Sequence, residues 1–425
     1  MRIAVIAFGT RGDVQPALAL GRALQRRDHE VRMVVGADFA AEVRRCGLDA
    51  VLSPVDFRRM LTSSRGTDMV ELGNGAGYRT FSRALKRLFV INGPALMDSV
   101  YRAAADADAV ISSFTSDVYA VSVAQKLGIR HISTALQPTP VATRSGAAAP
   151  SAPLAREESL INFAFHKAMI EPFAWRTMNR TTNEFRREVL GLPSQSRRRY
   201  QRAFRAAPIL QGFSPSVVPH PKDWPATIHT TGYWFLDHDL GWTPPHDLLD
   251  FLDDGEPPVF VGFGSMTKRD GPALTRLVVD AVRDSGRRAI LQSGWARLGS
   301  GGRLPGNVYA IDDASHRWLF HRVSAVVHHG GAGTTAAGLR AGVPSVIVPH
   351  VADQPFWGRR VATLGAGPKP IPWAKLTSHG LAVAIRQATT DPGMRQRAAD
   401  LGAKVRAENG VATAVTLIDR YLNEP

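Results

Sequence analysis

The chain has 425 residues, of which 44% are hydrophobic and 21% charged, and its formal net charge is +15 at pH 7. This length exceeds one ordinary domain, and no stretch approaches the roughly 20 apolar residues that a membrane span needs, so a globular protein of two or three domains is expected. The only cysteine, Cys46, excludes an internal disulfide framework and fits a reducing, cytoplasmic location.

The positive charge is compatible with nucleic acid, a membrane surface or phosphate groups as partners. Most of the excess is arginine scattered along expected helices, which favours a solvated surface. The densest run, RRRYQRAFR at residues 197–205, lacks a zinc pattern or a recognition-helix context. No nucleic-acid partner is therefore expected, whereas contact of this basic run with anionic lipid stays open.

Short β-rich runs alternate with helical segments through the first half of the chain. Residues 2–8 are interpreted as a buried strand, because their apolar run is shorter than the core of a secretory signal. Further strands are expected at residues 29–36, 107–113 and 129–136. This alternation predicts βαβ units in a parallel, doubly wound sheet.

The middle of the chain has a less regular pattern. Residues 138–159 are rich in Ala, Pro and Ser and predict a long mobile loop that shapes a binding site, and residues 160–190 look helical. Residues 219–248 are dense in Pro, Trp and His, as expected of a connection between domains.

A second βα series follows this connection. Strands are expected at residues 258–266, 287–294, 307–312, 323–329 and 344–350. The chain thus divides into a first doubly wound domain over 1–218, a linker over 219–248 and a second domain from 249. Ligands of such sheets bind at the carboxyl ends of the strands, so a shared site is expected in the cleft between the domains.

The stretch VVHHGGAGTTAAGLRAG, residues 326–342, carries the strongest chemical signal. A strand runs into a glycine-rich turn, and Thr334 and Thr335 stand where a helix would begin. Unpaired N–H groups at a helix start, together with glycine and threonine, favour a phosphate or diphosphate. No Gly-Lys-Ser/Thr follows, so the motif is not a P-loop, and the first βα turn, GTRGD, lacks the GxGxxG of dinucleotide sites.

The adjacent histidines His328 and His329 could indicate a metal, a phosphate contact or simple packing. A metal is not expected, because the chain has one cysteine and no HxxxH or HxxEH pattern. A histidine directed at a phosphate is favoured over a core histidine, with both interpretations kept.

With four other stretches, this motif makes the chain resemble the GT-B glycosyltransferases, a nucleotide-sugar-dependent superfamily that includes bacterial antibiotic and sterol glycosyltransferases. The resemblance spans nearly the whole chain. It is carried by GTRGDVQPALALGRALQRRDHEV (9–31), TGYW (231–234), VFVGFGSM (259–266), LQSGW (291–295) and HHGGAGTT with AGVPSVIVPHVADQPFWGRRV (328–361). The resemblance implies an α/β fold of two Rossmann-like domains facing across a cleft. It also implies a donor-binding domain over 249–407 and a C-terminal helix, 408–425, that crosses back to the first domain.

The resemblance implies roles for residues of the donor motif. His329, Ser265, the hydroxyl of Thr334 and the N–H groups of the turn would hold the donor diphosphate. Asp353 and Gln354 would bind sugar hydroxyls, and Trp295, Ala314 and Ser315 would line the nucleoside, with ordinary packing as the alternative for these last three. The residues of the turn are Gly331, Ala332 and Gly333.

Asp13 is the expected catalytic base, which takes the proton of the acceptor hydroxyl as the sugar carbon is attacked. Plant relatives have a histidine at this position and an aspartate that orients it, but here the second position is Ser113, as in the bacterial antibiotic and sterol branch. The alternative is that Asp13 only caps the following helix. Arg11 and Gly12 belong to the same acceptor loop, and Arg11 is expected to pair with Asp13 or to touch ligand.

The resulting hypothesis is an inverting, metal-independent transferase that moves a sugar from a UDP- or dTDP-sugar to a hydroxyl of a bulky, partly apolar acceptor. No other cofactor is expected, and a monomer or weak dimer is expected. The acceptor would be a natural-product aglycone or a sterol-like lipid, bound by residues of about 55–100 and 138–185. Its expected aromatic and apolar contacts are Phe57, Met60, Phe81, Phe89, Phe163, Phe173 and Trp175.

Three alternatives are kept. A nucleotide-sugar epimerase or a lipid-linked cell-wall transferase would share the fold, and a non-catalytic helper would bind the nucleotide sugar without turnover. Asp13 argues against the helper, since a protein that only binds has no use for a base.

Overall fold

The computed structural model describes residues 1–56, 59, 77–113, 116–149, 157–236, 241–264, 271–294, 298–299 and 302–424, with the backbone alone for 77–85, 88, 89 and 174. The described residues divide into two compact units. Unit 1 contains the described residues of Met1–Met69, Tyr78–Leu240 and Glu408–Pro425, and those of Gly241–Ala407 make up most of unit 2.

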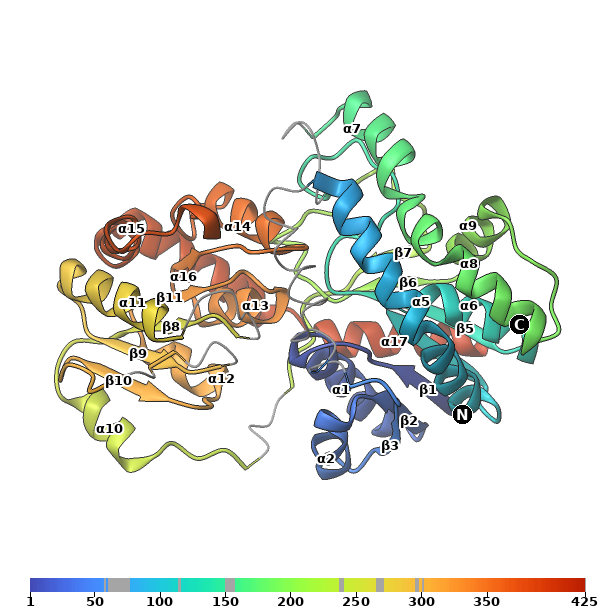
Figure 1. The fold of residues 1–425 in the computed structure, drawn as a ribbon, viewed down its shortest axis with the longest axis horizontal. Coiled ribbons are helices and arrows are strands. Elements are labelled where there is room, and N and C mark those ends of the chain that lie inside the picture. The colour runs from blue at the N-terminus through green and yellow to red at the C-terminus, as the bar shows by residue number, and fades with distance from the viewer. Residues whose placement is uncertain are drawn as a thin grey trace. The chain divides into compact units, whose positions relative to one another are not determined.

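In its described part, unit 1 contains a fully parallel seven-stranded sheet of order β3-β2-β1-β4-β5-β6-β7 (Figure 1). The strands are β1 (Arg2–Ile6), β2 (Glu30–Val35), β3 (Asp49–Leu52), β4 (Ala109–Ser113), β5 (Arg130–Ala135), β6 (Ile209–Gln211) and β7 (Ile228–Thr230). The helices are α1 (Arg11–Gln25), α2 (Ala37–Arg45), α5 (Gly77–Ala104), α6 (Asp117–Leu127), α7 (Leu160–Phe165), α8 (Phe173–Glu188), α9 (Arg197–Ala206) and α17 (Gly410–Asn423), with a π-helix, η1, at His166–Ile170. The order reverses between β1 and β4, so helices cover both faces and the inner strands are apolar on both sides.

Unit 2 repeats this plan with the order β10-β9-β8-β11-β12, again parallel throughout its described part. Its strands are β8 (Val259–Gly262), β9 (Ala289–Gln292), β10 (Val308–Ile311), β11 (Ala325–His328) and β12 (Ser345–Ile347). Its helices are α10 (His246–Asp253), α11 (Gly271–Ser285), α12 (His316–Leu319), α13 (Ala332–Ala341), α14 (Gln354–Thr363), α15 (Ser378–Thr390) and α16 (Pro392–Ala407), with 3₁₀ turns η2 (Phe320–Arg322) and η3 (Trp373–Lys375). The predicted α/β class with two doubly wound sheets is confirmed.

Three short strands, β3, β6 and β7, were not predicted. They have three or four residues each, too few to show a period. β7 lies inside residues 219–248, the predicted linker, and pairs with β6 in the sheet of unit 1. Neighbouring prolines argue against a strand here, so the sequence pattern does not predict β7. Through this pairing the described residues from 219 to 236 belong to unit 1 rather than to a linker.

Helix α17 belongs to unit 1, although it follows the whole of unit 2 in the chain. It packs against α1 (Figure 1). Ile418 and Leu422 belong to the same hydrophobic core as Leu18 and Leu24. A hydrogen bond of 2.8 Å between His29 Nε2 and Asp419 Oδ1 also joins α17 to the connection between α1 and β2. The last helix is thus part of the core of unit 1.

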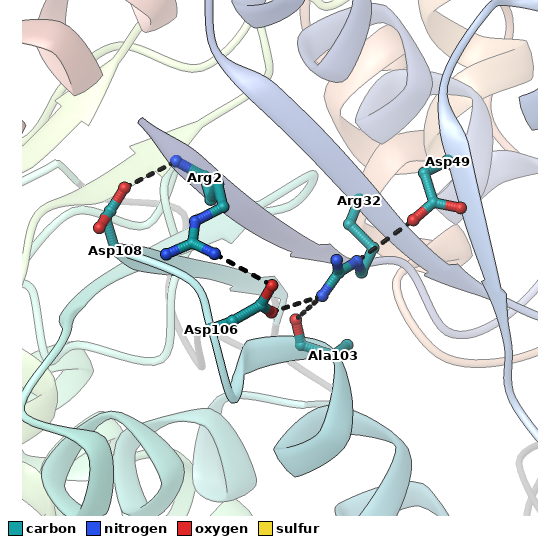
Figure 2. A network of polar contacts seen from close by, with 6 residues as sticks. All are labelled: Arg2, Arg32, Asp49, Ala103, Asp106 and Asp108. Atoms are coloured by element: carbon teal, nitrogen blue, oxygen red, sulfur yellow. Dashed lines mark hydrogen bonds and ion pairs between the residues drawn. The ribbon is translucent and has the colours of Figure 1, made fainter.

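Charged residues meet at the amino ends of the strands of unit 1. Arg32 on β2 contacts Asp49 at 3.2 Å and Asp106 at 2.7 Å, and Arg2 contacts Asp106 at 3.2 Å (Figure 2). The backbone N–H of Arg2 also donates to Asp108 at 2.7 Å. The Arg32 guanidinium lowers the pKa of Asp106. This network joins three neighbouring strands at the edge opposite their carboxyl ends, so its role is structural.

The segment expected to be a mobile loop is instead anchored in its described part. Val141, Ala142 and Thr143 are buried. The backbone of Val141 and of Ala142 and the hydroxyl of Thr143 are hydrogen-bonded to side chains far away in sequence. No helix among the described residues is long and apolar enough to span a membrane.

Candidate functional site

The carboxyl edge of each sheet carries the residues that the sequence singles out. β1 lies next to β4, and β8 next to β11, at the two points where the strand order reverses. The loop after β1 leads to Asp13, and the loop after β11 contains His329. Crevices at such reversal points are where open parallel sheets bind ligands.

In unit 1, Asp13 lies in the first turn of α1. Thr10 is the N-cap, and its backbone N–H donates to Asp13 Oδ2 at 2.8 Å, while its hydroxyl lies 3.2 Å from the same oxygen. The bond from the Thr10 N–H is the Asp13 half of a capping box, whose other half joins the Thr10 side chain to the Asp13 backbone N–H. The predicted capping role is therefore present.

The cap uses one carboxylate oxygen and orients the other. Bonds within the described residues engage Oδ2, and Gly9 lies so close to this oxygen that a side chain at position 9 would collide with it. Burial raises the pKa of Asp13, against the lowering effect of the Thr10 hydrogen bonds. A higher pKa makes the carboxylate a stronger base, so capping and proton transfer are compatible in one residue. Arg11 and Gly12 are exposed beside it.

In unit 2, His328 ends β11 and is completely buried. Its Nδ1 accepts a hydrogen bond of 3.0 Å from the N–H of Gly330, which has a φ of +88°. Burial, followed by the neighbouring His329 and His316, keeps the pKa of His328 well below its ordinary value. His328 thus holds the glycine turn in shape as a neutral side chain.

The next residue, His329, lies against two glycines. A Cβ added at Gly331 would lie 2.5 Å from His329 Nε2, and one at Gly264, after β8, would lie 3.0 Å from its Cε1. Nδ1 is buried and has no hydrogen-bond partner in the described part of the chain. Burial lowers the pKa of His329 to about 4, so the ring is neutral at pH 7. A neutral imidazole beside a helix start can donate one N–H to a bound anion.

Helix α13 begins at this point, with Gly331 as its N-cap and no capping side chain from the described residues. Its first-turn N–H groups, at Ala332, Gly333 and Thr334, lack intrahelical partners, and the helix dipole favours an anion there. Thr335 is buried, and its hydroxyl donates to Gly331 O at 2.9 Å, so it stabilises the turn. Thr334 is partly exposed and adds a further donor beside the free amides.

Asp353 and Gln354, the expected sugar contacts, lie at the start of α14 with much of their polar surface in use. Gln354 is buried, and its Oε1 accepts from the N–H groups of His350 at 2.8 Å and Val351 at 3.1 Å. Asp353 Oδ2 accepts from the indole of Trp357 at 2.8 Å. These bonds fix the loop after β12, and the sugar contacts stay a prediction.

The structure gives structural roles to two of the expected nucleoside contacts. Ala314 is buried in the core with Phe260 and Leu319. Ser315 is the N-cap of α12 and accepts from the N–H of Trp318 at 3.2 Å. Ser265 and Trp295 lie outside the described residues.

The residues predicted to contact the acceptor differ in burial, and some of them are not described. Trp175 is buried and stacks on Tyr200 with ring centroids 5.3 Å apart, so it is a core residue rather than a ligand contact. Phe163 on α7 is 37% exposed, and Phe173 is partly buried. Phe57, Met60 and the side chains of Phe81 and Phe89 lie outside the described part.

The sequence did not indicate a buried carboxylate, Asp117, near the carboxyl edge of the sheet of unit 1. Asp117 begins α6, and its two oxygens accept from the hydroxyls of Ser112 at 2.5 Å and Ser133 at 2.9 Å. His131 Nε2 lies 2.8 Å from the same Ser112 hydroxyl. No spacing in the sequence indicates this group, because strand pairing brings its members together. It joins β4, β5 and α6 behind the edge that carries Asp13.

Within the described residues no group of three His, Cys, Asp or Glu side chains is arranged to hold a metal ion. The chemistry available at the two edges is thus a capped carboxylate in unit 1 and an anion-binding helix start with a neutral histidine in unit 2.

Solved structures with this fold are glycosyltransferases of the GT-B class. The calicheamicin glycosyltransferase CalG4 superposes with a TM-score of 0.72 at 18% identity over 100% of this chain and 99% of its own. The glycosyltransferase VinC in complex with dTDP has a TM-score of 0.68 at 18% identity, covering 99% of each chain. At these identities the likeness establishes the fold class.

Sequence comparisons narrow this class to a family. The glycosyltransferase family 28 N-terminal domain matches residues 3–132, and the erythromycin biosynthesis protein CIII-like C-terminal domain matches residues 277–416. O-mycaminosyltylonolide 6-deoxyallosyltransferase of Streptomyces fradiae is 38% identical over 99% of this chain and 97% of its own length. The chain therefore belongs to the glycosyltransferases, as its motifs predict.

A second group of relatives is fungal and longer. The sterol 3-beta-glucosyltransferase of Emericella nidulans is 37% identical over 99% of this chain. The chain spans 30% of the length of that relative. The two groups differ in the acceptor that their names state, O-mycaminosyltylonolide or a sterol.

Proposed function

We propose that the protein transfers a sugar, with inversion and without a metal, from a UDP- or dTDP-sugar to a hydroxyl of a bulky, partly apolar acceptor. The observation that carries the proposal is the start of α13, which has no capping side chain among the described residues and lies beside neutral His329. This helix start lies at the point where the strand order of unit 2 reverses. The names of the relatives support a sterol or antibiotic aglycone as acceptor.

Each residue has a defined part in this reaction. The amides of Ala332, Gly333 and Thr334 and the N–H of His329 stabilise the charge that grows on the leaving diphosphate as the bond to the sugar carbon breaks. Asp13 Oδ1 takes the proton of the acceptor hydroxyl. At the same time the hydroxyl oxygen attacks the sugar carbon from the face opposite the leaving diphosphate. The products are the glycoside, the nucleoside diphosphate and a protonated Asp13, which returns its proton to water.

A donor and acceptor screen tests the proposal. UDP- and dTDP-sugars are incubated with a panel of sterols and macrolide or peptide aglycones, and release of UDP or dTDP is measured together with the glycoside. The anomeric configuration by NMR tests inversion, and EDTA tests metal independence. Donor incubated alone is the control: an epimer formed without acceptor would indicate an epimerase, and nucleotide-sugar binding with no product in any pairing would contradict a transferase.

A further inference from the structure

The segment that follows β5, residues 136–149, leaves the sheet of unit 1 at the carboxyl edge. β5 pairs with β4, which pairs with β1, and all three strands are parallel. The segment therefore begins at the same edge of the sheet as the loop that leads to Asp13.

This segment has no regular secondary structure, so its backbone N–H groups need partners outside a helix or ladder. Three of them donate to side chains from three separate parts of unit 1. The bonds run from Thr139 N to Gln211 Oε1 at 3.0 Å, from Ala142 N to Glu171 Oε1 at 2.9 Å and from Arg144 N to Asp223 Oδ2 at 2.7 Å.

Glu171 is the buried carboxylate of this set, with a side chain that is 4% exposed. It follows the π-helix η1 and forms ion pairs with Lys167, 3.1 Å away, and with Arg205 of α9. Single π-turns within helices are uncommon and occur often at functional sites. Here the carboxylate at the end of the π-helix accepts the Ala142 N–H and is held by ion pairs with Lys167 and Arg205.

Asp223 accepts the backbone N–H of Arg144, two residues after Ala142 in the segment. Its second oxygen accepts from the hydroxyl of Thr143 at 2.7 Å, so the carboxylate bonds both the side chain of one residue and the backbone of the next. The adjacent Trp224 donates its indole N–H to Val141 O at 3.3 Å. Hydrogen bonds to carboxylates are stronger than those between neutral groups, so these contacts fix the path of the backbone.

We propose that Glu171 and Asp223 are positioning residues that hold segment 136–149 as a fixed wall of the acceptor site. This inference rests on the proposed transfer reaction. It assigns acceptor affinity to two carboxylates that form no hydrogen bond with Asp13 among the described residues. It also makes the segment a permanent wall rather than a lid.

The test measures KM for acceptor, KM for donor and kcat for Glu171→Ala and Asp223→Ala. Each substitution removes the partner of a backbone N–H, and KM for acceptor is expected to rise about five- to tenfold while KM for donor stays within about twofold. Glu171→Gln keeps an oxygen for Ala142 and should restore most of the acceptor affinity. Lys167→Met is the matched control. It removes the ion pair between the half-exposed Lys167 and Glu171 but leaves the hydrogen bond from the Ala142 N–H to Glu171 in place.

Asp223 is exposed, so Asp223→Ala is expected to fold even if Glu171→Ala does not. Hydrogen exchange of segment 136–149 is a readout that does not depend on transfer: the amides of Ala142 and Arg144 should be protected in the wild type and lose protection in the corresponding variant. Fast exchange of both amides in the wild type, or folded variants with unchanged acceptor KM, would overturn the inference. A protected segment in a protein that transfers no sugar would instead contradict the proposed function.

Discussion

At the scale of single residues, Asp13 caps helix α1, and the geometry of this cap is compatible with the base role that we propose for the same carboxylate. One oxygen closes the capping box with Thr10, and burial raises the pKa of the carboxyl group. The cap holds the carboxylate in one orientation, as the proposed proton transfer requires.

Asp13→Asn separates these roles, because an amide oxygen still accepts from the Thr10 N–H but cannot serve as a base. We expect kcat to fall by about 10²- to 10⁴-fold, the usual contribution of a general base. Affinity for UDP or dTDP, measured by calorimetry, should not change, and thermal unfolding should show an intact fold. Turnover equal to that of the wild type would remove Asp13 from the mechanism.

His329 gives a second prediction at this scale, through its pKa of about 4 against an ordinary 6.5. The unfolded chain takes up a proton here near pH 6.5, whereas the folded chain does so only near pH 4. The free energy of unfolding should therefore fall as the pH falls through this window. In His329→Gln the fall should be smaller, and in the exposed His379→Gln it should match the wild type. Denaturant unfolding at a series of pH values measures the free energy of unfolding of the three proteins. An equal pH dependence in all three would refute the burial of a neutral His329.

At the scale of an element, the start of α13 depends on close contact between a glycine and the His329 ring. A Cβ at Gly331 would lie 2.5 Å from Nε2, so Gly331→Ala must displace the ring or the turn. We expect about tenfold weaker binding of UDP or dTDP with a stability loss of about 1 kcal/mol or less, since alanine is a poorer N-cap than glycine.

Gly306→Ala is the matched control in the same unit, because an added Cβ there has no atom within 4 Å. Calorimetry of both variants measures the effect. Full affinity in Gly331→Ala would show that the anion does not bind at this helix start.

At the scale of the whole molecule, the chain builds two units with separate cores, and unit 1 is completed only by α17. Ile418 is 1% exposed within that core. Ile418→Ala is expected to destabilise unit 1 by about 2–5 kcal/mol, the usual cost of emptying a buried aliphatic site.

Unit 2 keeps its own core, so nucleoside diphosphate affinity at 25 °C should be unchanged in Ile418→Ala. Thr413→Ala, on the exposed side of the same helix, is the control and should unfold like the wild type. Loss of donor binding in step with unfolding of unit 1 would contradict the independence of the two cores.

The sequence by itself determined the features that rest on local patterns. Apolar runs separated by helical periods predict two parallel sheets, and the stretch from His328 to Thr335 predicts an anion site at a helix start, because strand, turn and helix are contiguous there. The tertiary structure decided what depends on segments distant in the chain. In the folded chain α17 belongs to unit 1 and β7 to the first sheet, and Trp175 and Ala314 are buried in the cores. Asp117 is hydrogen-bonded to Ser112 and Ser133. Segment 136–149 is hydrogen-bonded to the side chains of Gln211, Glu171 and Asp223. The physical reason is that hydrogen bonds and burial act between groups close in space, and only the folded chain brings such distant residues together.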